Sequence, residues 1–195
     1  MERDEEQRQE WLSEAKGLDV NQFVFVDECG SHTGLARSRA RAPRGNRAYA
    51  SLPRNTGPNT TIIASLSIEG VGETMVVEGA TNTVVFETYL EKVLAPSLSP
   101  GQIVIADNLS AHKSQRAREL VEARGARLWF LPAYSPDYSP IENAFSKLKS
   151  YLRKTQARTR EALQTAIAEA LRAITPQDAQ GYFQHCGYSI PSHPL

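Results

Sequence analysis

Three acidic residues stand at positions that suit metal-assisted chemistry: Asp27, Asp107 and Glu142. Asp27 directly follows the apolar run 23–26, and Asp107 follows the apolar run 103–106. Thirty-four residues lie between Asp107 and Glu142, and Glu142 is at the start of a predicted helix. Hard divalent cations prefer oxygen ligands, and a few carboxylates can share two ions in a reaction at phosphorus. We therefore hypothesise that the three acids meet in space and bind metal ions.

Local structure explains each of these acids when it is taken singly. Aspartate is favoured where strands pass into loops, which accounts for Asp27 and Asp107. The segment 139–142, Ser-Pro-Ile-Glu, fits a capping box with Ser139 at the N-cap and Glu142 at the third helical position. The metal site is favoured only by the three acids together, because open α/β sheets bind ligands at the ends of their strands.

Several neighbours of the three acids are candidates for supporting roles. Successive strand residues point to opposite faces of a sheet, so Asp27 and Glu28 cannot both face one site. We assign the site to Asp27 and treat Glu28 as a solvent-facing or supporting residue. The other predicted supporting residues are Asn108, His112 and Asn143, with His112 positioning a loop as readily as acting in catalysis.

The elements expected from the hydrophobic pattern form an α/β order. The first nineteen residues predict a charged helix, in which Trp11, Leu12 and Ala15 are the apolar stripe. Strands are predicted at 23–27, 60–68, 74–77, 103–107 and 127–131. Helices are predicted from 81 or 82 to 95, from 110 or 111 to 124, from 140 to about 152 and from 160 to 174, followed by a short segment at 176–184.

Length and composition indicate one globular domain of 195 residues. The longest apolar runs are far shorter than the roughly 20 residues that cross a bilayer, and no signal peptide pattern follows Met1. Cys29 and Cys186 suggest neither a disulfide framework nor a metal-ligand pair. The cytoplasm is therefore the expected location.

The formal net charge is zero, but the charges are segregated along the chain. Residues 31–68 carry six arginines and no acid, and all six arginines lie in a segment, 31–58, that is predicted as a long irregular insertion. Residues 143–160 also carry six basic side chains and no acid. Such blocks are as often solvated surface as nucleic-acid sites. The DNA-binding candidates are Arg37, Arg39, Arg41, Arg44, Arg47, Lys149 and Arg153.

Three stretches together resemble the catalytic domain of IS630-type transposases of the Tc1/mariner superfamily. They are Val26-Asp27-Glu28-Cys29-Gly30, then Ile105-Ala106-Asp107-Asn108 with His112, and then Leu131-Pro132-Ala133-Tyr134-Ser135-Pro136 running into Pro140-Ile141-Glu142-Asn143. The resemblance covers about residues 20–175, and the spacing of thirty-four residues between the second and third acids is also that of the family.

This resemblance implies an RNase H-like fold, with a mixed five-stranded sheet whose first three strands are antiparallel and with helices on both faces. It also implies a DDE triad of Asp27, Asp107 and Glu142 that binds two Mg²⁺ or Mn²⁺ ions. The expected reaction is hydrolysis at the transposon ends, followed by attack of the freed 3′-hydroxyl on target DNA at a TA dinucleotide. A dimer on DNA, associated with the nucleoid, is expected, with the basic residues contacting phosphates.

One departure concerns the amino-terminal region, where full-length relatives carry helix-turn-helix modules that recognise the transposon ends. We expect residues 1–20 to be a charged helical segment, 21–175 the catalytic domain and 176–195 a tail. The chain is then either a second reading frame that is fused to a helix-turn-helix domain by frameshifting, or a truncated remnant that binds DNA or regulates. Another RNase H-like nuclease is the remaining alternative.

Overall fold

The computed structural model describes residues 3–37 and 39–190. The elements are α1 (Glu5–Lys16), β1 (Phe23–Ser31), β2 (Thr60–Ser67), β3 (Gly70–Glu78), α2 (Thr83–Tyr89), β4 (Ile103–Ala106), α3 (Gln115–Glu122), β5 (Arg127–Phe130), α4 (Pro140–Thr155), α5 (Arg160–Arg172) and α6 (Pro176–His185). In the described part of the chain, no helix is long and apolar enough to cross a membrane.

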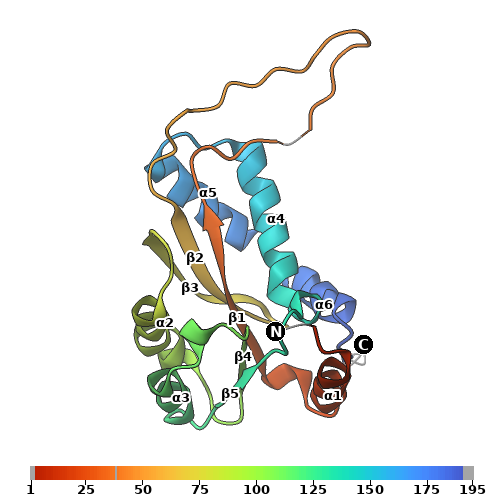
Figure 1. The fold of residues 1–195 in the computed structure, drawn as a ribbon, viewed down its shortest axis with the longest axis vertical. Helices are drawn as coiled ribbons and strands as arrows, with labels where there is room; N and C mark the ends of the chain where they lie inside the picture. Colours follow the sequence, from red (N-terminus) through yellow and green to blue (C-terminus); the bar gives the residue numbers. More distant parts are fainter. Residues whose placement is uncertain (1–2, 38, 191–195) are drawn as a thin grey trace.

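A mixed five-stranded sheet in the order β3-β2-β1-β4-β5 forms the centre of the molecule (Figure 1). Strands β1, β2 and β3 pair antiparallel, whereas β4 pairs parallel with both β1 and β5. The predicted antiparallel arrangement of the first three strands is therefore confirmed. The hairpin between β2 and β3 turns at the predicted position, where Gly70 has a φ of 120°, a conformation that glycine adopts without a Cβ penalty.

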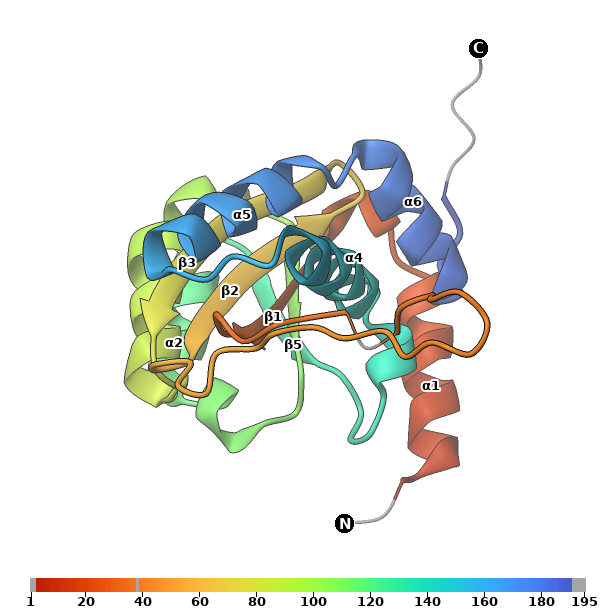
Figure 2. The ribbon, with the colours of Figure 1, turned by 90° about the horizontal axis from the view of Figure 1, so that it is seen from above.

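Alternate residues of the central strands pack into two separate apolar layers. Phe23 and Phe25 face a core that also contains side chains from α1, α4, α5 and α6. Val24 and Val26 face a second core, which α2 and α3 cover from the other side. Figure 2 shows these two groups of helices on opposite faces of the sheet. A strand covered on both faces must be apolar throughout, which explains the continuous run from 23 to 26.

Strand β1 is longer than the sequence pattern predicted. Its pairing with β4 ends at Val26, opposite Ala106, but its pairing with β2 continues as far as Ser31. Asp27 therefore lies inside a strand, at the point where one of the two neighbouring strands is no longer present. The strand was expected to end at Asp27, but only its pairing with β4 ends there, while its pairing with β2 continues.

The segment after β4 also differs from the prediction of one helix that starts at residue 110 or 111. A single 3-10 turn spans Ser110–His112, and α3 begins only after Ser114, whose hydroxyl accepts from the backbone N–H of Ala117. The sequence signal was misleading because the turn and the helix form one polar stretch without an intervening proline or glycine. Helix α2 likewise continues as a π-helical turn and a 3-10 turn up to Ser97.

Helices α1 and α6, which lie in the predicted helical segment 1–20 and the predicted tail 176–195, both contribute side chains to the core. In α1, Trp11 stacks on Trp129 of β5, with 4.4 Å between the ring centroids, and Ala15 is buried. In α6, Phe183 is fully buried and contacts Phe25 of β1 edge to face. The last five residues of the predicted tail, 191–195, lie outside the described residues.

A long irregular segment, 32–59, leaves the body between β1 and β2 (Figure 1); we call it the arm. Most of its described side chains are exposed. Its first residues are attached to the body, because Arg158 donates from Nη1 to the backbone oxygens of Thr33 at 2.8 Å and Leu35 at 3.0 Å. The arm therefore has a fixed base and an extended outer part.

Helix α1 is joined to the loop before α4 by the side chain of Arg8, which is only 1% exposed. Arg8 binds both carboxylate oxygens of Asp137, at 3.1 and 2.6 Å, and donates to the backbone oxygen of Tyr134 at 3.1 Å. Its guanidinium also lies over the ring of Tyr138, 4.3 Å from the centroid. This cluster connects two segments that are separated by more than a hundred residues.

We predict that Arg8→Ala lowers the free energy of unfolding by about 2–4 kcal/mol, because it removes the hydrogen bonds and leaves a cavity beside Tyr138. Arg3→Ala is the matched control, since Arg3 makes only an exposed ion pair with Glu5. Chemical denaturation of both variants measures the difference. Equal unfolding midpoints for the two variants would contradict the structural role of Arg8.

Candidate active site

The three predicted acids line one cavity of about 500 Å³ at the end of the parallel strands. Asp27 comes from β1, Asp107 from the loop that follows β4, and Glu142 from the first turn of α4. The β1–β4 register, which pairs Val26 with Ala106, places Asp27 and Asp107 at equivalent positions of adjacent strands. The sheet therefore brings together two residues that are eighty positions apart in the sequence.

Asp27 is the most perturbed of these carboxyl groups. Burial raises the pKa of Asp27 to about 8, and the negative charges of Glu142, Asp107 and Glu28 add to the effect. A hydrogen bond acts in the opposite direction, because the backbone N–H of Glu28 donates to Oδ1 of Asp27 at 2.7 Å. An ionised Asp27 consequently requires a positive charge beside it.

His112 joins two acids across the end of the sheet. Its Nδ1 lies 2.5 Å from Oδ1 of Asp107, and its Nε2 lies 2.9 Å from Oε1 of Glu28. The ring is buried and lies against the ring of Phe86 at a tilt of 34°, with 4.1 Å between the ring centroids. Burial lowers the pKa of His112, but the two hydrogen-bonded carboxylates raise it to about 9. The imidazolium therefore holds Asp107 in place, and Glu28 in turn holds the imidazolium.

Glu142 does not make the capping box that the segment 139–142 suggested. No side chain caps the start of α4, where Ser139 is the N-cap residue and Pro140 occupies the first position. Within the described part of the chain, no hydrogen bond or ion pair engages the Glu142 carboxylate. Its side chain is instead directed to the cavity that it shares with Asp27 and Asp107. The capping box therefore does not explain the acid at this position.

The chemistry of the site fits a divalent cation, because its donors are carboxylate oxygens and one of them is a half-buried acid with a raised pKa. The acids are spread around the cavity, however. Among residues 3–37 and 39–190, no three His, Cys, Asp or Glu side chains are close enough together to hold a metal ion. Direct binding of one ion by all three acids would require their side chains to rotate toward one another.

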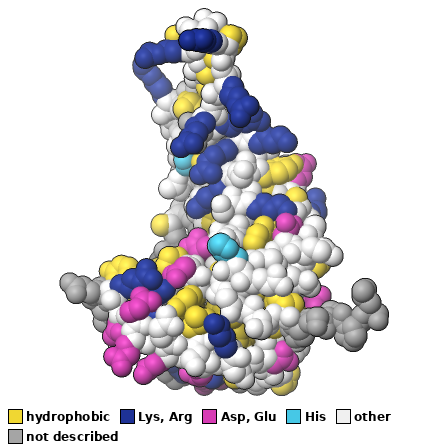
Figure 3. Space-filling view, turned by 90° about the vertical axis from the view of Figure 1, so that its right-hand side faces the viewer, with side chains coloured by type: hydrophobic (Ala, Val, Ile, Leu, Met, Phe, Trp, Pro, Cys, Tyr) yellow, Lys and Arg dark blue, Asp and Glu magenta, His cyan; other side chains and the backbone are white. Residues whose placement is uncertain are grey.

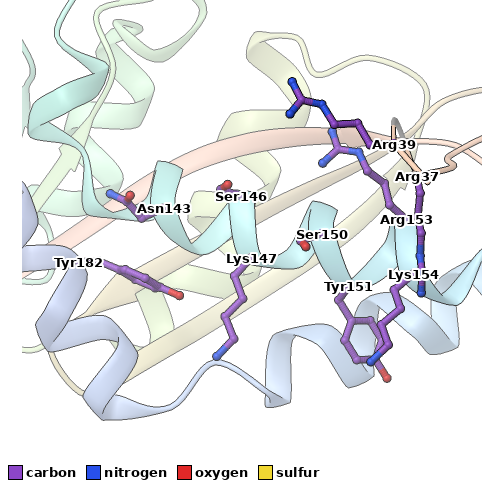
Figure 4. A pocket seen from close by; sticks show the side chains of 10 residues that line it. All are labelled: Arg37, Arg39, Asn143, Ser146, Lys147, Ser150, Tyr151, Arg153, Lys154 and Tyr182. Atoms are coloured by element: carbon purple, nitrogen blue, oxygen red, sulfur yellow. The ribbon is translucent and has the colours of Figure 1, made fainter. Parts of the chain in front are cut away.

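A second concave surface lies along another face of α4 and is lined by basic and polar side chains (Figure 4). We call it the basic groove; its volume is about 850 Å³. It is lined by Arg37, Arg39, Asn143, Ser146, Lys147, Ser150, Tyr151, Arg153, Lys154 and Tyr182. In Figure 3, Lys and Arg side chains gather on the arm and on the adjoining part of the body, whereas acidic side chains are concentrated toward the other end. The groove thus suits a polyanion.

The other predicted site residues are divided between these two regions. Asn108 lines the acid cavity, and His112 contacts Asp107. Asn143 does not face the acids, since it lines the basic groove and donates to Sγ of Cys186 at 3.6 Å. The sequence could not distinguish these two asparagines, because each simply follows an acid.

The predicted DNA-binding residues also differ in their placement. Arg37, Arg39 and Arg153 line the basic groove, whereas the remaining arginines project from the arm and are exposed: Arg41, Arg44 and Arg47. Lys149 is half-buried and is not among the residues that line the groove. It lies near Cys29, where burial raises the pKa of the thiol to about 11 and the charge of Lys149 acts in the opposite direction.

Sequence reasoning missed several residues that line the acid cavity. Lys113, Leu109 and Tyr134 belong to this group. They come from loops whose conformation the hydrophobic pattern does not specify. Tyr182 of α6 in the basic groove was missed for a similar reason, since only the packing of α6 against α4 brings it there.

A family model described as DDE superfamily endonuclease matches residues 22–164. No curated protein sequence gives a significant match. Solved structures that resemble the chain include the Mos1 transposase paired-end complex with the left transposon end, at 19% identity and a TM-score of 0.72, covering 95% of this chain and 60% of that one. The catalytic domain of Mos1 mariner transposase is 18% identical with a TM-score of 0.62, covering 95% of this chain and 89% of that one.

These likenesses confirm the expected RNase H-like fold of a mixed five-stranded sheet with helices on both faces. The chain spans about 60% of the length of the transposase in the paired-end complex. A further Mos1 paired-end complex, described as containing Mg, is 20% identical to this chain with a TM-score of 0.67, covering 95% of this chain and 59% of that one.

We predict that the stability of the metal-free protein falls as the pH rises from about 4 to about 8. In this window Asp27 keeps its proton in the folded state, whereas the unfolded chain releases it near the ordinary pKa of 3.8. Asp27 alone lowers the free energy of unfolding by up to about 1.4 kcal/mol for each pH unit in this window. Denaturant unfolding in EDTA at several pH values measures the slope.

The variant Asp27→Asn should flatten this pH dependence between about pH 4 and 6, because it removes the group that titrates there while preserving the shape of the side chain. Above about pH 6.5 the raised pKa of His112 makes the stability of both proteins fall with rising pH. Asp27→Asn should also make the protein more stable than the wild type at pH 8 in EDTA. An unchanged slope in Asp27→Asn would show that burial does not perturb this carboxyl group as described.

Proposed function

We propose that this chain, which belongs to the DDE superfamily of endonucleases, is the catalytic domain of an IS630-type transposase of the Tc1/mariner group that cuts and joins DNA. The observation that carries the proposal is the convergence of Asp27, Asp107 and Glu142 on one cavity, from three separate elements within the matched span. The likeness to Mos1 transposase structures supports the same assignment.

In this proposal, Asp27, Asp107 and Glu142 hold two divalent cations, Mg²⁺ or Mn²⁺. When bound there, such ions activate the attacking oxygen and offset the charge that develops on the leaving oxygen. Mos1 structures described as containing Mg and Mn support the choice of metal. The raised pKa of Asp27 supports it independently, because burial alone leaves its negative charge uncompensated.

Other residues at the cavity are assigned separate roles in orienting the acids and in binding a phosphate. His112 and Glu28 keep the Asp107 carboxylate oriented toward the cavity by hydrogen bonds at 2.5 and 2.9 Å. Lys113, which also lines the cavity, is a candidate to neutralise a phosphate. The proposed sequence of reactions begins with hydrolysis at a transposon end by water, which breaks a phosphodiester bond and frees a 3′-hydroxyl. That hydroxyl then attacks a phosphodiester of target DNA at a TA dinucleotide, so that a new phosphodiester bond forms and the target strand's own 3′-oxygen leaves.

We propose that the basic groove and the arm bind DNA phosphates. Arg37, Arg39 and Arg153 line the groove, and Lys154 is a further candidate. Lys147 is partly neutralised, because its Nζ lies 2.6 Å from Oδ2 of Asp178. Such contacts supply affinity that depends on salt and little on sequence. The exposed arginines of the arm extend this surface away from the body (Figure 3).

Recognition of specific transposon ends is assigned, in this proposal, to a helix-turn-helix domain that is separately encoded or fused by frameshifting. The Mos1 paired-end complexes, of which the chain spans about 60%, support an assembly on transposon ends. We further propose that the chain works as a dimer on DNA of the cytoplasmic nucleoid.

We predict that Glu142→Gln lowers kcat for nicking of supercoiled plasmid in Mg²⁺ or Mn²⁺ by about 100-fold or more, because it removes a charged oxygen ligand. Glu161→Gln is the matched control, since Glu161 is exposed in the first turn of α5. The same assay on Asp107→Ala tests a second acid. Wild-type rates in Glu142→Gln and Asp107→Ala would reject the proposed metal site.

We also predict that Arg153→Gln weakens DNA binding and reduces the slope of log Kd against log salt concentration by about 1, because one phosphate contact is lost. Arg118→Gln provides the control, since Arg118 is exposed on α3 and pairs with Glu122. Fluorescence anisotropy with a labelled duplex at several salt concentrations measures both slopes. A slope unchanged by Arg153→Gln would remove the basic groove from the DNA path.

A further inference from the structure

The acid cavity has an apolar rim beside its carboxylates. Leu109 and Tyr134 line the cavity, and their exposed fractions are 56% and 63%. Exposed large apolar side chains are few in the described part of the chain, and these two line the same cavity. Pro132 and Ala133 also line this cavity. A cavity lined by both carboxylates and exposed apolar side chains suits a ligand that has both a charged and a flat apolar part.

Tyr134 has an unusual backbone conformation that is held from outside the cavity. Its φ is 57°, in the left-handed region that a tyrosine seldom adopts. The backbone oxygen of Tyr134 accepts a hydrogen bond from Arg8 at 3.1 Å, and Arg8 also binds Asp137 of the same loop. Conformations of this kind persist only where surrounding contacts impose them, and they are concentrated at functional sites. The buried Arg8 cluster thus keeps an exposed aromatic ring at the rim.

We infer that Tyr134 and Leu109 bind the nucleobase adjacent to the reacting phosphate, with the ring of Tyr134 stacking on the base. This inference rests on the proposed function for the placement of the phosphate at the acids. Stacking on an aromatic ring is a sequence-tolerant way of holding a base, because every base has a π-face. The ligand is an unpaired nucleotide, since bases inside a duplex are already stacked on both faces.

The size of the cavity agrees with this ligand, and Lys113 places one positive charge beside the three acids. A volume of about 500 Å³ lies within the usual range of roughly 300–1,000 Å³ for small-molecule sites. Lys113 lines the cavity and supplies a positive charge for a phosphate, while its Nζ also lies 5.8 Å from the ring centroid of Phe130. A single nucleotide could therefore contact Lys113 with its phosphate and Tyr134 and Leu109 with its base.

The test uses the full chain in Ca²⁺ buffer and a DNA hairpin that ends in one unpaired 2-aminopurine nucleotide, whose fluorescence is quenched by stacking. The informative variants are Tyr134→Phe, which keeps the ring, and Tyr134→Asn, which removes it. Asparagine adopts the left-handed conformation more readily than most residues, so Tyr134→Asn preserves the loop. Val84→Ala controls for loss of an exposed apolar side chain, because Val84 is 68% exposed on α2, away from the cavity.

Wild type, Tyr134→Phe and Val84→Ala should quench the probe, whereas Tyr134→Asn should lose most of the quenching and bind the hairpin about 5- to 100-fold more weakly. Leu109→Ala should weaken binding in the same direction. A blunt hairpin without the unpaired base should bind wild type and Tyr134→Asn equally. Equal unfolding midpoints of wild type and Tyr134→Asn verify that the fold is retained.

Equal quenching by wild type and Tyr134→Asn, or no quenching by either, would overturn the inference. Equal weakening of the blunt and the unpaired hairpins would also overturn it, because the contact would then be to the backbone. The outcome is independent of the proposed catalysis: quenching that depends on Tyr134, in a protein that nicks no DNA in Mg²⁺ or Mn²⁺, would uphold base binding and reject the proposed function.

Discussion

The charge of Asp27 is the constraint on which the rest of the site depends. A carboxylate removed from water costs several kcal/mol unless a partner compensates it, and Asp27 is surrounded by acids. The sheet imposes this position, because β1 continues along β2 after its pairing with β4 has ended. The strand thus carries an acid into a half-buried location that only a bound cation or a proton makes favourable.

Helix α4 separates two electrostatic environments. Its first turn delivers Glu142 to the acid cavity, while Arg153 near its other end lines the basic groove. His112 adds a buried cation behind Asp107, on the face of the sheet that α2 and α3 cover. A polyanion that follows the groove would be attracted by the basic surface, and its reacting part would meet the acids only with metal ions present. The zero net charge of the chain conceals this separation.

The sequence was informative where one physical signal dominated. Buried strands such as β1 and β4 are recognisable as apolar runs, and the order of elements follows from hydrophobic period and turn residues. The convergence of Asp27 and Asp107 could be expected because both follow such runs. The capping box at Ser139 was a wrong alternative, since the local pattern fitted but the structure shows no side-chain cap. Loop conformation and long-range packing, which place Tyr134 and Asn143, depend on contacts with residues far away in the sequence.

The packing of α1 has a consequence for any attempt to isolate this domain. The family model begins at residue 22, and a protein trimmed to that boundary would lack both Trp11 and Arg8. Trp129 and Tyr138 would then become an exposed aromatic surface, and surfaces of this kind promote aggregation. Asp137 would lose its bidentate partner at the same time. The smallest well-behaved fragment therefore starts before α1, and sequence similarity alone would place its beginning too late.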